Sequence, residues 1–438
     1  MGWDLWLVRF DRNNLACLLE FGMLSKRSSR RSFIKTSAVA GAYLIGSRAF
    51  ASPNPPSVIV VGAGAFGGWT ALHLLEKGAK VTLLDAWGPG NSRASSGGET
   101  RVIRATYGSG RIYTQMVGHA LGLWREYEQR WRQRLLFQTG VLWMTGKDDS
   151  YERASLPLIT EAGMRYERLS AADCSKRWPQ INFDGVSWAV YEPDSGYLAA
   201  RRSCEALLYG FLKQGGEYRQ AQVTPGQIAS NQMQGIKINF GEVLHADQYV
   251  FACGPWLGKV FPFLAPSITP TRQEVFFFGT TAGDTRFTDK LPVWSDDSKV
   301  QLPGFPGNHW FYGIPGNHWR GFKIADDMRG AVVDPTTMER KISDQGLAAA
   351  RAFLRLRFPG LAEAPLVESR VCQYENSTDQ NFILDHHPEA ENVWILGGGS
   401  GHGFKHGPAF GDMASDAVLG TKAPPAEFKI ERLLKSSG

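Results

Sequence analysis

The clearest pattern of apolar and polar positions lies directly after a pair of prolines at 55–56. The β-branched run SVIVV at 57–61 is followed by a glycine-dense turn, a segment with apolar residues at helical spacing, and a second apolar run that ends at Asp85. Short β-branched runs bounded by turn residues predict strands, whereas apolar residues three or four positions apart predict an amphipathic helix. The pattern therefore predicts a strand–helix–strand unit over residues 57–85.

Two other segments repeat apolar residues every three or four positions, and both are expected to be helices with one face in a core. The first set is Ile112, Met116, Ala120, Trp124 and Tyr127, and the second is Leu347, Ala350, Phe353 and Leu354. Near the C-terminal end, WILGGGSGHGFKHGP at 394–408 predicts a strand that ends in a glycine-rich turn and opens a helix. Such a turn would let the backbone lie flat against a planar ligand.

Length and charge narrow the classes of protein to consider. The chain has 438 residues, more than one hydrophobic core usually supports, so two domains are expected. The formal net charge is +6, but eight of the 48 basic residues and only three of the 42 acidic residues lie in residues 1–51. The rest of the chain has 40 basic and 39 acidic residues, so it has no charge excess that would attract nucleic acid.

The basic N-terminal segment has the features of a twin-arginine export signal. SRRSFIK at 29–35 is followed by a mildly apolar stretch at 36–46 and by an AxA-type processing site at 49–51. A membrane span needs about 20 apolar residues, so this shorter stretch predicts cleavage after Ala51 and no stable membrane anchor.

We therefore expect a periplasmic or secreted protein whose partners include the twin-arginine export machinery. Residues 1–22 lie upstream of any normal signal, and Met23 would open a conventional one, so the start of the chain is expected at Met23.

The cysteines and histidines predict neither a metal site nor a disulfide scaffold. The five cysteines are scattered without CxxC pairs, at Cys17, Cys174, Cys204, Cys253 and Cys372. Cys253 ends the apolar run YVFAC and is expected in the core. The histidines at 309, 318, 386 and 387 lack a helical HxxxH spacing and are expected to be ordinary loop residues.

The turn after the first predicted strand carries the motif GxGxxG at Gly62, Gly64 and Gly67. In a dinucleotide-binding unit the first glycine allows the tight turn, the second lets the backbone approach a pyrophosphate, and the third allows the helix to pack on the strand. Asp85, at the end of the second strand, stands where a carboxylate accepts ribose hydroxyls. The motif predicts dinucleotide binding, and by itself it leaves both FAD and NAD open.

Two long motifs are more specific: SSGGETRVIRATYGSG at 95–110, and the stretch at 370–408 that begins RVCQYENSTD. Together they resemble the sarcosine oxidase and N-methyltryptophan oxidase family, within the D-amino-acid-oxidase-like FAD enzymes. Weaker similarity follows in order at 248–256, 271–278 and 312–323.

The resemblance implies an α/β fold with an α+β second domain: a Rossmann-type FAD-binding domain and an interleaved mixed-sheet substrate domain. The FAD-binding domain is expected at 57–139, 197–268 and 370–425, and the substrate domain at 140–196 and 269–369.

The resemblance also implies a role for individual residues. Cys372 matches the position that forms a thioether to the flavin in these oxidases, so a covalent FAD is expected. Lys323 matches the lysine beside the flavin that promotes electron transfer to O₂. Arg104 and Lys405 match the two cations that hold the substrate carboxylate.

Other positions are expected to line the flavin and the substrate pocket by the same match. Arg101 and His402 are expected, with Lys323, close to the reacting atoms. The remaining residues are Thr100, Tyr312 and Tyr374, together with Gly399, Gly401 and Gly403, whose backbone would lie against the flavin.

The chain departs from the family pattern at two positions. Gly97 stands where the sarcosine oxidases have a histidine beside the flavin, and Asp327 stands where they have a histidine on the substrate side. A carboxylate at Asp327 would favour a substrate with a cationic group, such as a longer or basic side chain.

The expected activity is an FAD-dependent oxidation of a small amine or amino acid to an imine, with reduction of O₂ to H₂O₂, in a monomeric enzyme. Two alternatives stay open from the sequence. One is a dehydrogenase that passes electrons to a quinone or cytochrome, and the other is an exported flavin-binding protein without turnover.

Overall fold

The computed structural model describes residues 54–434, apart from residues 240, 289 and 317–319. The predicted export signal, the expected start at Met23 and His318 lie outside these described residues. None of the helices in the described part combines the length and the apolar character that a membrane span requires.

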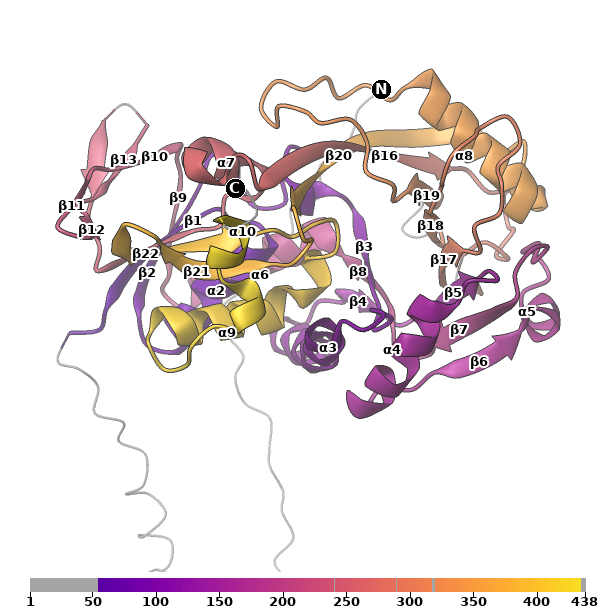
Figure 1. The fold of residues 1–438 in the computed structure, drawn as a ribbon, viewed down its shortest axis with the longest axis horizontal. Helices are drawn as coiled ribbons and strands as arrows, with labels where there is room; N and C mark the ends of the chain where they lie inside the picture. The colour runs from indigo at the N-terminus through magenta and orange to yellow at the C-terminus, as the bar shows by residue number, and fades with distance from the viewer. Residues whose placement is uncertain (1–53, 240, 289, 317–319, 435–438) are drawn as a thin grey trace, which may run out of the picture. The chain divides into compact units, whose positions relative to one another are not determined.

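The glycine motif lies at the centre of a six-stranded sheet (Figure 1). In spatial order its strands are β21 (Ile383–His387), β22 (Ala390–Gly397), β15 (Gln248–Phe251), β1 (Ser57–Val61), β2 (Lys80–Asp85) and β9 (Glu217–Gln220). Neighbouring strands are parallel except for the antiparallel pair β21 and β22. The predicted strand–helix–strand unit is confirmed, with α2 (Ala65–Glu76) between β1 and β2.

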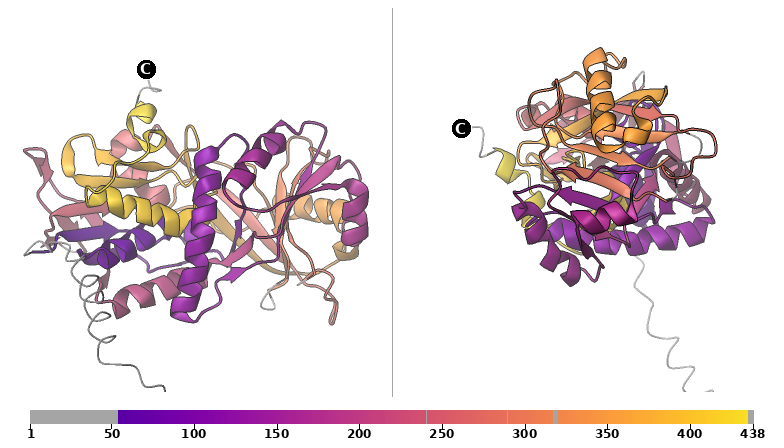
Figure 2. Two further views of the ribbon diagram at one scale, coloured as in Figure 1. Left: turned by 90° about the horizontal axis from the view of Figure 1, so that it is seen from below. Right: turned by 90° about the vertical axis from the view of Figure 1, so that its right-hand side faces the viewer.

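Helices cover this sheet through one large apolar core. The helix α2 packs beside α9 (Gly407–Val418), as Figure 2 shows, and also against α6 (Ala200–Lys213). The predicted helix around Met116 is α3 (Arg111–Trp131), and it packs against α9. Its buried Trp124 and Tyr127 contact the Trp69 ring of α2 edge-on, with centroids 5.2 and 4.7 Å apart. The apolar spacing therefore gave the buried face of α3 correctly.

A second, eight-stranded sheet of mixed direction adjoins the first (Figure 1). In spatial order its strands are β20 (Leu366–Ser377), β16 (Ile268–Phe278), β19 (Phe322–Asp326), β18 (Phe311–Ile314), β17 (Val293–Asp297), β5 (Val141–Thr145), β7 (Trp188–Glu192) and β6 (Glu167–Ser170). Only β17 and β5 run parallel. The α/β class with a mixed second sheet is thus confirmed.

The helices next to the eight-stranded sheet are α4 (Ser150–Glu161), α5 (Ala171–Arg177) and α8 (Asp344–Arg357). The hydroxyl of Ser343 accepts the Gly346 N–H and caps α8, as serine commonly does at a helix start. At its other end, buried Arg357 pairs with Asp296 of β17 at 2.6 Å. The predicted apolar face of α8 lies in the core of this sheet.

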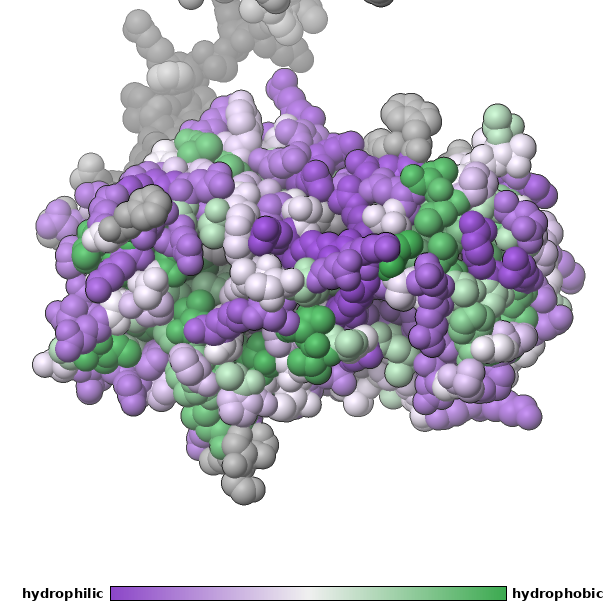
Figure 3. All heavy atoms as spheres, turned by 90° about the horizontal axis from the view of Figure 1, so that it is seen from above, coloured by the Kyte–Doolittle hydropathy of each residue, from purple (hydrophilic) through white to green (hydrophobic). Residues whose placement is uncertain are grey.

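Three smaller sheets complete the described part of the fold. The one that matters for the site has the order β3 (Thr100–Ile103), β8 (Gly196–Ala199) and β4 (Leu136–Phe137). Two others lie near β9: β10 (Val223–Pro225) with β13 (Ile236–Ile238) and β14 (Glu242–Leu244), and β11 (Ile228–Ala229) with β12 (Gln232–Met233). On the face seen in Figure 3, apolar side chains lie in small groups among polar ones.

Candidate active site

The three motif glycines are each required by a different contact. Gly62 has φ +107°, and a Cβ there would lie 2.3 Å from the Ala252 carbonyl oxygen. A Cβ at Gly67 would lie 2.0 Å from the Gly62 carbonyl oxygen, so only glycine lets α2 pack on β1. Gly64 has only the Ser96 hydroxyl nearby, at 3.4 Å, and borders a cavity. The geometry agrees with a turn, a packing contact and an open approach for a ligand.

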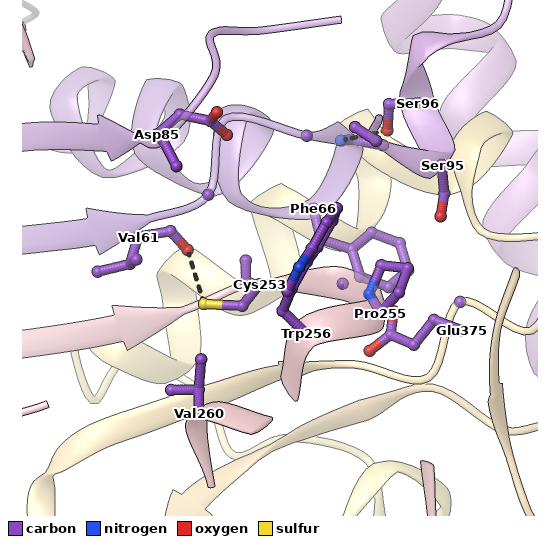
Figure 4. Close-up of a pocket in the computed structure, with 18 of the residues that line it drawn as sticks. Val61, Phe66, Asp85, Ser95, Ser96, Cys253, Pro255, Trp256, Val260 and Glu375 are labelled. Atoms are coloured by element: carbon purple, nitrogen blue, oxygen red, sulfur yellow. Dashed lines mark hydrogen bonds between the residues drawn. The ribbon is translucent and has the colours of Figure 1, made fainter. Parts of the chain in front are cut away.

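This cavity has a volume of about 570 Å³ and lies at the carboxyl ends of β1, β2 and β15 (Figure 4). Ligands of parallel α/β sheets bind at this edge. Residues that line it include Gly62, Gly64, Phe66, Asp85, Ser96, Arg101, Cys253, Trp256, Tyr374, Glu375, Gly399, Gly401 and Gly403. The sequence analysis did not single out Phe66, Trp256 or Glu375.

The Asp85 carboxylate borders the same cavity and organises the loop around it. One oxygen accepts the Ala63 N–H at 2.8 Å, and the other accepts the N–H groups of Trp87 and Gly88 at 2.9 and 2.8 Å. Burial raises the pKa of Asp85, while these three hydrogen bonds oppose the rise. A carboxylate has further acceptor capacity beyond three bonds, so it can also accept a ribose hydroxyl.

The C-terminal glycine turn forms the opposite wall of the cavity. Gly401 has φ +81°, and a Cβ there would lie 2.7 Å from the Tyr374 ring. A Cβ at Gly403 would lie 2.9 Å from the Phe66 ring, whereas Gly399 faces open space apart from atoms 3.9 Å and more away. The predicted helix follows as a short 3₁₀ turn at Phe404–His406 and then α9.

A second cavity of about 80 Å³ shares the walls Arg101, Tyr374, Gly401 and Phe404 with the first. It brings together all five residues that were expected to bind the substrate, together with His402 and Cys372. The five are Arg104, Tyr312, Asp327, Tyr374 and Lys405. Arg104 follows β3, Asp327 follows β19, Tyr312 and Tyr374 lie on β18 and β20, and Lys405 lies in the C-terminal turn, so the fold assembles the small cavity between its two main sheets.

Arg104 and Lys405 lie close to one ring, that of Tyr107. The Arg104 guanidinium carbon lies 4.5 Å from the Tyr107 ring centroid and 4.6 Å from that of Trp143. The Lys405 Nζ lies 5.2 Å from the Tyr107 centroid and donates to the His402 carbonyl at 2.7 Å. Burial and the charge of Arg104 lower the pKa of Lys405 well below its usual range. An anion placed between these cations would relieve their repulsion.

Asp327 has partners within the chain that the sequence did not reveal. Its Oδ1 accepts the Tyr374 hydroxyl at 2.6 Å, and its Oδ2 lies 3.8 Å from Arg329. Burial raises the pKa of Asp327, and Arg329 opposes the rise. Because Arg329 already provides a cation, the carboxylate does not by itself require a basic substrate side chain.

Lys323 is buried with 3% of its surface exposed, and it lines neither cavity. Its Nζ donates to the Thr100 carbonyl oxygen at 3.1 Å and lies 5.4 Å from the Tyr312 ring. Arg101 donates to the same carbonyl at 2.8 Å. Burial and the charge of Arg101 lower the pKa of Lys323 to about 7. Thr100 lines neither cavity, and its buried hydroxyl oxygen has no hydrogen-bond partner.

Cys372 is a half-buried free thiol on β20 at the small cavity. Its Sγ lies 3.6 Å from Arg101 Nη2, so a cation stands beside the sulfur that was expected to bond to flavin. Cys253, which was expected in the core, is half-buried: it packs against an apolar core cluster and also lines the large cavity. It lies two residues beyond the end of β15, where the chain turns along the cavity wall.

His402 makes two hydrogen bonds: its Nε2 donates to the Gln380 carbonyl at 3.1 Å, and its Nδ1 lies 3.3 Å from the Tyr107 hydroxyl. The same hydroxyl lies 2.8 Å from His406 Nε2. Burial lowers the pKa of both histidines well below the usual range, so both are neutral. Tyr107 was missed from the sequence, although it stands three positions after Arg104 in the same motif.

Gly97 leaves no space for a side chain, because a Cβ would lie 1.7 Å from the Asn91 carbonyl oxygen. The histidine of the resembled family could not stand there without a different path for the loop around 91–97. Among the described residues, no group of three or more His, Cys, Asp or Glu side chains is arranged to hold a metal ion. His309 instead contacts Asp326, at 2.6 Å.

A family model described as FAD dependent oxidoreductase matches residues 57–417, and the chain belongs to this family. Monomeric sarcosine oxidase of Bacillus sp. (strain B-0618) is 32% identical over 378 residues, which cover 83% of this chain and 92% of that protein. N-methyl-L-tryptophan oxidase of Salmonella newport (strain SL254) is 28% identical over 389 residues, which cover 87% of this chain and 99% of that protein. The expected relationship is confirmed, and the chain is an FAD-dependent oxidoreductase of the sarcosine oxidase type.

Solved structures with low sequence identity share the fold. L-proline dehydrogenase from P. horikoshii has a TM-score of 0.74 at 18% identity and covers 88% of this chain and 99% of its own. Amadoriase I from Aspergillus fumigatus, a fructosyl amine:oxygen oxidoreductase, has a TM-score of 0.73 at 19% identity, with coverage of 88% and 92%.

The large cavity suits FAD by its own chemistry. The N-terminus of α2 borders it at Gly64, and the N–H groups at a helix start can bind phosphate. One of them, the Ala65 N–H, donates to the Ser96 hydroxyl at 3.1 Å. Asp85 lies at the end of β2 for a ribose, and the turn at 398–403 leaves room for a flat ring. These residues would hold the dinucleotide with its ring next to the small cavity.

Proposed function

We propose that this enzyme oxidises the carbon–nitrogen bond of a small amino acid and uses O₂ as the final electron acceptor. The substrate loses two electrons and two protons to become an imine, and O₂ gains both to become H₂O₂. FAD, when bound, supplies the two-electron chemistry. The observation that supports this proposal most directly is the pair Arg104 and Lys405 at a small cavity that adjoins the FAD cavity.

The carboxylate of the substrate is the group that these two cations would bind. Arg104 offers a planar fork and Lys405 a point charge, and both lie against the Tyr107 ring. Since burial and mutual repulsion weaken the protonated form of Lys405, a bound carboxylate restores it. An amine without a carboxylate would leave this charge cluster uncompensated.

The volume of the small cavity favours a compact substrate. About 80 Å³ holds a few non-hydrogen atoms, in the range of a small N-methyl or other short amino acid. Asp327, which also lines this cavity, can accept an N–H from the amine while Tyr374 and Arg329 hold it in place. A small zwitterion thus complements the site better than a long basic side chain.

Two finer proposals rest on the match to the sarcosine oxidases. Cys372 would bond covalently to FAD, in line with its free thiol and with the Arg101 Nη2 that lies 3.6 Å from its sulfur. Lys323 would favour electron transfer to O₂ through its positive charge, because a fixed cation stabilises developing superoxide. Export through the twin-arginine route is proposed from residues 29–51 alone.

The proposal is tested by incubating the purified chain with a panel of N-methyl and unmodified small amino acids and measuring H₂O₂. Peroxide should form in proportion to imine hydrolysis products, and Arg104→Gln should need far more substrate. Oxidation seen only with an artificial electron acceptor would identify a dehydrogenase instead. Acid precipitation of the wild type and of Cys372→Ser then tests covalency, because only the wild-type pellet should retain flavin.

A further inference from the structure

Glu375 is a buried acid in the wall of the FAD cavity that the proposed reaction does not use. It belongs to β20, has 6% of its surface exposed, and borders the large cavity together with Phe66 and Gly399 (Figure 4). The N–H groups of Gly398 and Gly399 donate to its carboxyl group. Its Oε1 has no hydrogen-bond partner.

The surroundings of Glu375 offer no compensating positive charge. In the part of the chain that the structure describes, no basic side chain pairs with this carboxyl group. The titratable group that faces it from the 253–256 segment is the Cys253 thiol, whose own pKa is raised by burial. The Phe66 ring of α2 lines the same cavity, and the register partner of Glu375 on the neighbouring strand β16 is Pro270.

Burial therefore raises the pKa of Glu375 to about 7, in spite of the two backbone hydrogen bonds. Close to neutral pH the carboxyl group is present in both its protonated and its ionised form. The protonated form has an O–H donor, whereas the ionised form can only accept. A buried polar atom without a partner is costly, so Oε1 needs a ligand atom that suits one of these two forms.

We propose that Glu375 is protonated in the FAD complex and donates a hydrogen bond from its carboxyl group to an acceptor oxygen or nitrogen of the cofactor. FAD carries acceptor oxygen and nitrogen atoms as well as a negatively charged pyrophosphate. An ionised Glu375 would repel that charge and leave its own oxygen unpaired. The neutral acid adds no charge, and its O–H gives both Oε1 and the acceptor atom of FAD a hydrogen-bond partner. FAD binding is thus coupled to proton uptake at Glu375.

This inference rests on the assignment of FAD to the large cavity and is independent of the substrate. It makes a specific prediction, because glutamine keeps an N–H donor and a C=O acceptor at every pH. In the Glu375→Gln chain, the contribution of residue 375 to FAD binding should therefore be the same in acid and in mild base. The wild-type carboxyl group should bind FAD well only while it holds its proton.

The experiment uses the full chain with Cys372→Ser, so that FAD exchanges freely, with and without Glu375→Gln. Both proteins are freed of FAD and titrated with it between about pH 6 and pH 8, and the dissociation constant is measured by quenching of flavin fluorescence. The quantity compared is the dissociation constant of the chain with Glu375 divided by that of the Glu375→Gln chain. Other groups such as Lys323 titrate equally in both chains, so their effect cancels in this ratio. This ratio should increase from near 1 to about tenfold as the pH rises through the pKa of Glu375.

Glu391→Gln on β22, an exposed acid outside the cavity, is the matched control and should leave the ratio near 1 at every pH. Circular dichroism confirms that each variant is folded. A ratio for Glu375→Gln that stays constant over the range overturns the proposal while FAD binding itself stands. Failure of the Cys372→Ser chain to bind FAD at any pH overturns both this inference and the cofactor assignment.

Discussion

The Nζ of Lys323 donates a hydrogen bond to the backbone carbonyl of Thr100 at 3.1 Å, which joins β19 of the eight-stranded sheet to β3 beside the FAD cavity. Arg101 donates to the same carbonyl oxygen. Two cationic side chains therefore share one acceptor in a buried place, and this explains why the pKa of Lys323 falls to about 7.

The first prediction concerns the reaction with O₂. Lys323→Met should slow the reoxidation of substrate-reduced enzyme by O₂ about 100-fold or more, the typical effect of losing one preorganised charge, while reduction by substrate changes little. Because the pKa is lowered, the wild-type lysine loses its proton as the pH rises through about 7, so wild-type reoxidation should slow above that pH. Stopped-flow measurements of the two half-reactions provide the check, with Lys237→Met on the exposed face of β13 as the control. Equal reoxidation rates in Lys323→Met and wild type would remove Lys323 from the oxygen reaction.

The second prediction concerns the substrate carboxylate. Arg104→Gln and Lys405→Met should each raise the KM for an amino-acid substrate about tenfold to 100-fold, because a hydrogen bond to a charged group contributes roughly 1.5–3 kcal/mol. The wild-type KM should also rise with pH, since a lowered pKa means that Lys405 loses its charge as the pH increases. That pH dependence should flatten in Lys405→Met. A substrate amine without a carboxylate should show neither effect, and a KM that is unchanged in both variants would place the carboxylate elsewhere.

The third prediction concerns Gly97, which stands where the resembled oxidases have a histidine. Gly97→Ala forces a methyl group against the Asn91 carbonyl and should destabilise the protein by about 1–3 kcal/mol, the usual cost of overpacking. Gly122→Ala is the matched control, because Gly122 is exposed in the interior of α3 with no atom within 4 Å of its added Cβ. This second change should stabilise the protein by about 0.5–1 kcal/mol. Thermal denaturation of both variants and of the wild type measures these changes. Equal melting temperatures of Gly97→Ala and the wild type would contradict the close contact at Gly97.

The strand–helix–strand unit and the glycine positions could be predicted because they depend on local rules. A residue such as Gly62 is constrained by its own turn, and the buried face of α3 follows from the spacing of Met116 and Trp124. The family resemblance added Arg104 and Lys405, which the structure brings together at one cavity.

The remaining features depend on contacts between distant segments. The hydroxyl that Asp327 accepts belongs to Tyr374, 47 positions away, and Lys323 of β19 donates to the Thr100 carbonyl of β3. Glu375 has an ordinary sequence context, and only the fold shows that it is buried beside a cavity without a cationic partner. Cys253 packs against the core as expected, but a strand pattern does not show that the residues after the strand also border a ligand cavity.

The fourth prediction concerns export. Replacement of Arg30 and Arg31 by lysine should leave the protein in the cytoplasm, whereas wild-type protein should reach the periplasm with its leader removed after Ala51. Cell fractionation followed by N-terminal sequencing measures both outcomes. Arg27→Lys, outside the arginine pair, is the control. Equal amounts of periplasmic protein from the Arg30/Arg31 variant and the wild type would refute the twin-arginine assignment.

The most direct test of the central claim is an anaerobic titration of the purified enzyme with small N-methyl and unmodified amino acids, followed by addition of O₂. A small amino acid should bleach the visible flavin absorbance, and O₂ should restore it with formation of one equivalent of H₂O₂. Arg104→Gln should need much more substrate for the same bleaching. A flavin that no amino acid bleaches, or one that is bleached equally well by amines without a carboxylate, would contradict the central claim.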